Sequence, residues 1–203
     1  MIRRLVRRFG ARIRRAHGER GVALVEMAIV APFLALLVAG IVEYGTLWRD
    51  DLTVTSATRS AARVVSNAGN TEGADLEGIL SLRAALKSID GVTVEGLLIY
   101  DASAVDGQPD PSCFDAAGDP RSRNNLCNYY SAVQIETLTS ASFSGCTGPD
   151  ASFCPLSRDV NQTGGTTDLG VWVRVQRDFI TGILPGDGIT ITDYTVMKLE
   201  PES

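Results

Sequence analysis

The sequence has one histidine among its 203 residues, and this histidine, His17, lies close to the N-terminus. After it, no Ser-His-Asp triad, Cys-His pair or histidine-rich metal site can form. The sequence also lacks the GxxxxGK[ST] and HExxH motifs, and no GxGxxG follows a predicted strand. The acidic residues are spread through predicted loops, and no two of them stand out as a general acid and base. We therefore predict a protein that is not an enzyme and that needs no cofactor or metal.

Cysteine is also scarce. The four cysteines are separated by 13, 18 and 7 residues, and all of them lie in the second half of the chain: Cys113, Cys127, Cys146 and Cys154. Without a CxxC motif or a nearby histidine, two disulfides are a better interpretation than a zinc site. Three pairings are possible. We favour Cys113 with Cys127 and Cys146 with Cys154, because neighbours in sequence close the smaller loops.

Basic residues are unevenly distributed. Residues 1–21 carry eight arginines and one glutamate, a net charge of +7, whereas the rest of the chain has 11 basic and 23 acidic side chains, a net charge of −12. Such an arm can contact nucleic acid, serve as a transit peptide, or keep the N-terminus in the cytoplasm. We favour the third role, because an apolar run follows at once and there is no second basic patch. We expect no nucleic-acid partner.

The apolar run covers residues 22–48 and is long enough to span a membrane. As a helix these 27 residues measure about 40 Å, against a hydrocarbon core of about 30 Å. Tyr44 and Trp48 are expected at the far interface. The alternative, a buried core helix, rarely follows an arginine-rich arm. We predict a basic cytoplasmic leader (residues 1–21), a single transmembrane or assembly helix (22–48) and an extracytoplasmic domain (49–203).

Two charges interrupt this run, Glu26 near its start and Glu43 near its end. Glu26 near mid-bilayer would cost about 2.5 to 3.5 kcal/mol on insertion scales. A basic leader that ends in glycine, here Gly21, and a glutamate five residues later resemble the precursors of type IV pilins and pseudopilins. The resemblance implies cleavage between Gly21 and Val22, which leaves Val22 with a free amine one helical turn from Glu26. In assembled pilins the glutamate pairs with the N-terminal amine of a neighbouring subunit. Alternatively, Glu26 only marks the membrane edge.

Residues 21–45, GVALVEMAIVAPFLALLVAGIVEYG, are similar to the start of TadE-like proteins, which are minor pilin-like components of tight-adherence (Flp) pilus systems. The likeness rests on Glu26, Pro32 and the element Glu43-Tyr44-Gly45. It implies a membrane-anchored minor pilin, or pseudopilin, of the inner membrane that forms part of a pilus. The implied partners are prepilin peptidase, other pilin and pseudopilin subunits, and the inner-membrane assembly platform of the pilus.

The apolar run has two further features. Pro32 removes a backbone donor, so a kink or local melting near Ala28 is expected. Ala31, Ala35 and Ala39 recur every fourth residue, a small-xxx-small stripe on which another helix can pack in lipid. The alternative is that these alanines are simply good helix formers.

The remaining chain predicts an α+β domain. A first helical stripe (Val54, Ala57, Ala61, Val64) should end near residues 67–70, and a second (Ile79, Leu82, Leu86, Ile89) should stop at Asp90-Gly91. Segments rich in β-branched and aromatic residues predict an antiparallel sheet of about four strands. These segments cover residues 92–100, 129–138, 169–180 and 189–199.

Two long loops, residues 101–128 and 139–168, hold all the cysteines and are predicted to be stapled by disulfides rather than packed. We place any adhesive or partner-specific surface on them. Five aspartates in the first loop resemble a calcium loop only loosely, and a solvated loop is the better interpretation. They are Asp101, Asp106, Asp110, Asp115 and Asp119.

Two other functions stay open. A conventional signal peptide could be cut near Gly40, after Val38 and Ala39, to release a secreted binding protein. Alternatively, the span could only tether an envelope enzyme or sensor to the membrane.

Overall fold

The computed structural model describes residues 2–104, 106–160, 166–182 and 186–199, and side chains from residue 21 onward. Contacts divide the chain into two units, Met1–Gly45 and Thr46–Ser203. The first unit is helical throughout its described residues, as part of α1 (Ile2–Ala68). The second contains the rest of α1 and all other elements.

Four strands form one sheet in the second unit. They are β1 (Val92–Asp101), β2 (Cys127–Ser131), β3 (Asp168–Asp178) and β4 (Gly188–Lys198). Their order is β2-β1-β3-β4, and every neighbouring pair is antiparallel. The predicted α+β class with an antiparallel sheet is therefore confirmed.

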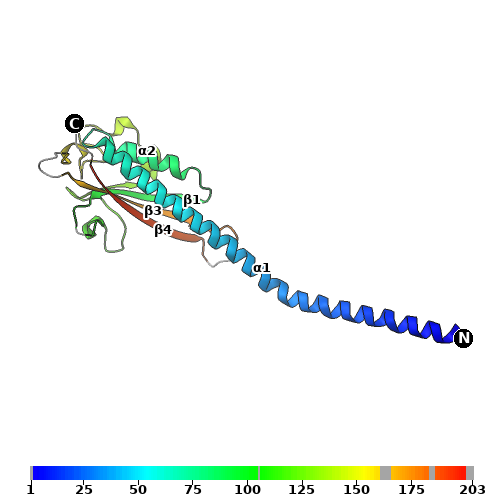
Figure 1. Cartoon of the computed structure of the whole chain (residues 1–203). Helices are drawn as coiled ribbons and strands as arrows, with labels where there is room; N and C mark the ends of the chain where they lie inside the picture. The colour runs from blue at the N-terminus through cyan, green and yellow to red at the C-terminus, as the bar shows by residue number, and fades with distance from the viewer. Residues whose placement is uncertain (1, 105, 161–165, 183–185, 200–203) are drawn as a thin grey trace. The chain divides into compact units, whose positions relative to one another are not determined.

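One face of the sheet is covered by helices. Figure 1 shows α2 (Ala74–Leu86) beside the part of α1 that begins at Thr46, both over the sheet. The side chains between these layers are apolar and fully buried, for example Ala61, Ile79, Leu97 and Val173. Since side chains alternate along a strand, Leu97 and Ile99 point to the helices while Leu98 and Tyr100 point the other way. The main core therefore lies between the helices and the sheet.

The predicted helix ends are largely correct. α1 ends at Ala68, and Gly69 follows with φ 61°, the left-handed conformation in which glycine commonly closes a helix. The buried valine on the last turns is Val65, whereas the predicted Val64 is only half-buried. α2 ends at Leu86, a few residues before the predicted stop, and Ile89 lies in the turn that follows.

The strand predicted over residues 129–138 is wrong in its second half. β2 ends at Ser131, and α3 (Ala132–Thr137) begins directly after it. Ser131 and Gln134 form a capping box: the Ser131 hydroxyl accepts from the Gln134 N–H at 3.4 Å, and the Gln134 side-chain oxygen accepts from the Ser131 N–H at 2.9 Å. This arrangement satisfies free donors at the helix start and so favours helix over strand.

The two long loops are packed more tightly than predicted. Disulfides join Cys113 to Cys127 and Cys146 to Cys154, the pairing favoured from the sequence. The first loop covers the face of the sheet opposite the helices, where the Phe114 ring contacts Trp172 edge-on at 5.4 Å between centroids. The second loop contributes Phe143 and Phe153 to the main core. These loops were expected to be held by disulfides alone, but their aromatic side chains give them buried contacts as well.

Candidate functional site

The apolar half of α1 exposes its hydrophobic side chains. Within the described residues, Gly21–Ala68 is the one helix long and apolar enough to cross a membrane, and none of its most apolar stretch is buried in the protein. Leu24, Phe33 and Ile41 are each more than 60% exposed. A continuous apolar surface of this kind marks a membrane or protein contact, because in water it would promote aggregation.

The predicted processing junction lies inside this helix. Gly21 and Val22 are both helical and exposed, and a side chain added at Gly21 would meet no neighbour. Glycine disfavours the helix by about 1 kcal/mol relative to alanine. The junction is therefore reachable from outside, at a point where local unwinding of the helix costs less than elsewhere.

Glu26 lies one helical turn after Val22 and is exposed. Among the residues whose side chains the structure describes, none forms a hydrogen bond or ion pair with Glu26. A single copy of the chain therefore supplies no described partner for a carboxylate in an apolar helix. The helix places the carboxylate and the Val22 backbone nitrogen on the same side, which is the arrangement required if a free amine at Val22 takes part in pairing.

Pro32 and the alanine stripe also lie on this exposed part of α1. The helix is unbroken through Ala28 and Pro32, and the kink expected there stays a prediction. Ala35 is exposed, and Ala31 and Ala39 are half-buried. Packing of a second helix on these alanines stays a prediction.

The end of the apolar run contains a buried charge that the sequence did not single out. Asp50 accepts a hydrogen bond from the Arg177 Nε at 2.5 Å, and the two side chains are only 10% and 3% exposed. The Arg177 guanidinium also donates to the Asp178 carbonyl. Asp50 therefore ties α1 to the end of β3, and because the partner is 127 residues away, no local pattern could have revealed the pair.

The aspartates of the first loop have structural roles. Asp101, Asp106 and Asp110 each accept a hydrogen bond from the backbone N–H two residues later, and Asp115 accepts two from its own turn. The Ser112 side chain and then the Ser112 backbone N–H lower the pKa of Asp110 below the ordinary value, and the backbone N–H groups of Asp119 and Ala117 lower the pKa of Asp115. Asp119 pairs with Arg174 at 3.0 Å. The signal for these turns is the recurrence of aspartates in a loop, where their side chains form Asx-turns.

A buried polar cluster lies at the start of α2. Asp75 forms an ion pair with Arg158 at 2.7 Å, and both side chains are fully buried. The other Asp75 oxygen accepts from the Tyr130 hydroxyl at 2.7 Å and from the Asn128 amide at 2.9 Å. Burial raises the pKa of Tyr130 well above its usual value, which keeps the hydroxyl a neutral donor. These bonds fix the second loop to α2 and β2.

The other carboxylate in this region is Asp150, which is almost fully buried and whose pKa is raised by burial. No three histidine, cysteine, aspartate or glutamate side chains converge as a metal-binding group within the described parts of the chain. In the bonds described above, the Asp75 carboxylate balances the charge of Arg158.

Taken together, the chain combines an exposed apolar helix, the one candidate membrane anchor among the described residues, with an α+β unit. Residues 21–63 match the model of the TadE-like protein family, so this segment is similar to TadE-like proteins and the resemblance read from the sequence is confirmed. This pilus-related family is not a family of enzymes. No curated protein and no solved structure matches the chain. The family match and the apolar helix fit a membrane-anchored, pilus-related protein.

Proposed function

We propose that the protein is a minor pilin, or pseudopilin, that is processed by prepilin peptidase after Gly21 and then takes part in assembly of a tight-adherence (Flp) pilus. The observation that carries the proposal is Glu26, a lone carboxylate on the exposed apolar part of α1, one turn from Val22 and without a partner among the described side chains. The TadE-like match over residues 21–63 supports the same assignment.

In this role each part of the chain has a physical task. The leader holds the N-terminus in the cytoplasm, and the apolar helix anchors the protein in the inner membrane with the α+β unit outside. After cleavage, the Val22 amine is positively charged near neutral pH. The amine of one subunit and the Glu26 carboxylate of the next then neutralise each other in an apolar setting and fix the register between subunits.

N-terminal sequencing tests the processing step. The full chain is recovered from membranes of a host with its prepilin peptidase and from a peptidase-deficient host. We expect a start at Val22 in the first host and at Met1 in the second. A start near Ile41 in both hosts would instead mean a secreted protein cut by a conventional signal peptidase, and an intact Met1 in both would mean a simple tether.

Glu26→Gln tests the register role separately, because it removes the charge while keeping the size of the side chain. We expect normal cleavage after Gly21 but loss of the protein from the pilus assembly fraction. Glu26→Ala is expected to give the same two results. Glu77→Gln is the matched control, since Glu77 is an exposed carboxylate on α2. Unchanged incorporation of Glu26→Gln would contradict the register role without touching the processing result.

A further inference from the structure

A groove of about 610 Å³ lies between the end of α2, the start of β1 and α3. Its apolar part includes Leu86, Ile89, Val92 and Val94, and all four also contact the main core. Leu80 lines the groove and is 47% exposed. The apolar floor of the groove is thus continuous with the main core, and no element of the described chain fills the groove.

The strand at this groove has an open backbone edge. β1 pairs with β3 from Val92 to Asp101 but with β2 only from Gly96 to Tyr100. On the β2 side, residues 92–95 therefore have no strand partner among the described residues. The cause is the capping box at Ser131, which turns the chain into α3 opposite Gly96. Unpaired N–H and C=O groups on a strand edge can pair with an added strand.

The rim of the groove carries excess positive charge. Arg83 and Lys87 of α2 line it, together with Glu136 of α3. Arg83 and Glu136 pair with each other at 3.2 Å. Lys87 is exposed and forms no ion pair with any described side chain. A carboxylate in the occupant would complement Lys87.

We propose that this groove binds an extended acidic peptide segment of a partner protein, which adds a short strand beside residues 92–95 of β1 and places a carboxylate near Lys87. Four strand residues span about 13 Å. A helix does not fit this edge, because its backbone donors and acceptors are already bonded within the helix. The apolar floor contributes most of the affinity, and the exposed charge contributes selectivity. The inference does not depend on the proposed pilus function.

Binding can be measured with two short probes and the full chain in lipid nanodiscs. The first probe is the capped, fluorescein-labelled pentapeptide Thr-Val-Thr-Glu-Thr, in which valine and glutamate lie on the same face of a strand. The second is its reverse, which covers the other strand direction. A control version of each probe carries lysine in place of glutamate. We expect fluorescence anisotropy to show binding of at least one glutamate probe and weaker binding of its lysine version.

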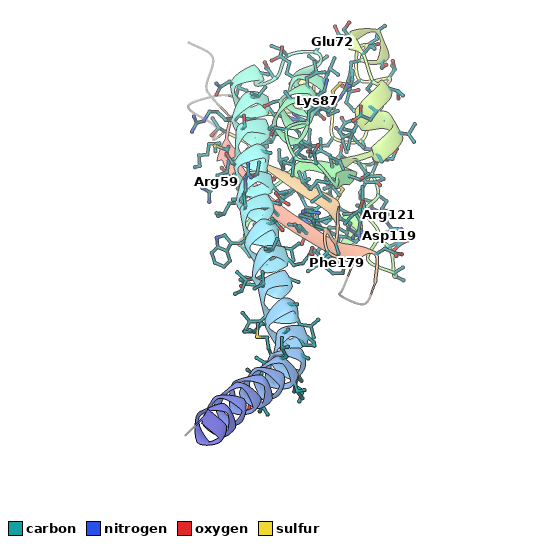
Figure 2. The ribbon with its side chains drawn as sticks, turned by 90° about the vertical axis from the view of Figure 1, so that its right-hand side faces the viewer. Arg59, Glu72, Lys87, Asp119, Arg121 and Phe179 are labelled. Carbon is teal, nitrogen blue, oxygen red and sulfur yellow. A yellow bond between two sulfur atoms is a disulfide. The ribbon has the colours of Figure 1, made fainter. Side chains whose placement is uncertain are left out.

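Charge reversal at Lys87 tests the site. Lys87→Glu is expected to weaken binding of the glutamate probe about fivefold, the effect of about 1 kcal/mol, and to strengthen binding of the lysine probe. Arg59→Glu makes the same charge change on α1, outside the groove, and is expected to leave both affinities unchanged (Figure 2). Equal effects of the two variants would overturn the assignment of the site.

Methylation of the probe amides tests strand addition. The amides of a strand point alternately to its two edges, and only one edge meets β1. We therefore expect methylation of one alternate set to abolish binding and methylation of the other set to be tolerated. Equal tolerance of both patterns would refute strand pairing. The absence of binding by every glutamate probe at millimolar concentration would refute the proposal as a whole.

Discussion

The buried pair Asp75–Arg158 offers a quantitative test of how the globular unit is held together. Asp75→Asn keeps the shape of the side chain but leaves the Arg158 guanidinium buried without its main counterion. That guanidinium also donates to the Phe153 carbonyl at 3.0 Å and lies 4.5 Å from the centre of the Phe153 ring. These contacts hold it in place after the carboxylate is lost, so it cannot escape to water without disrupting the loop.

Breaking a fully buried ion pair from one side costs about 3 to 5 kcal/mol. We expect the lower end of this range, because Asp150 also interacts electrostatically with Arg158 and offsets part of the lost charge. In a chain of this length, about 3 kcal/mol lowers the midpoint of thermal unfolding by roughly 6 to 12 °C. The assay is thermal and urea unfolding of the full chain in detergent micelles.

Two comparisons make the test specific. Asp119→Asn removes one partner of the pair with Arg174, in which the Asp119 side chain is 68% exposed, and should cost at most about 1 kcal/mol. Replacing both buried partners, Asp75→Asn with Arg158→Met, should recover part of the loss, because no guanidinium is then buried without its counterion, while Asp150 loses its interaction with Arg158. If Asp75→Asn destabilises no more than Asp119→Asn, the buried pair does not hold the second loop to α2.

Three further predictions concern the same unit. Burial raises the pKa of Asp150, so in the folded state this carboxylate holds its proton at higher pH than in the unfolded chain. Its ionisation therefore lowers stability as pH rises above about 4. Asp150→Asn should increase stability at pH 7 but not at low pH, and urea unfolding at several pH values would show this. Gly78→Ala should cost about 1 to 3 kcal/mol, because a methyl group there would overlap the Val65 side chain where α2 crosses α1, and unchanged thermal stability would contradict this close packing. Replacing Cys113 and Cys127 by serine should lower the free energy of unfolding by about 3 kcal/mol, because the disulfide closes a loop between cysteines 14 positions apart; urea unfolding of the variant is compared with that of the oxidised and the reduced parent.

The sequence by itself determined the features that depend on local pattern. The apolar run, the glycine and glutamate at its start, and the helix end at Gly69 are all readable from neighbours along the chain. Three of the four strands were found because β-branched residues and alternation mark them directly. The capping box Ser131-x-x-Gln134 was also readable, but the β-rich residues before it hid the change from strand to helix.

The tertiary structure alone decided which charges are buried. Asp75 and Asp50 look like ordinary surface residues in the sequence, yet each is buried against an arginine that comes from a distant segment. The open edge of residues 92–95 likewise depends on where β2 ends relative to β1. These features depend on contacts between elements far apart in the chain, because burial and strand pairing are set by which surfaces meet and not by the residues next in sequence.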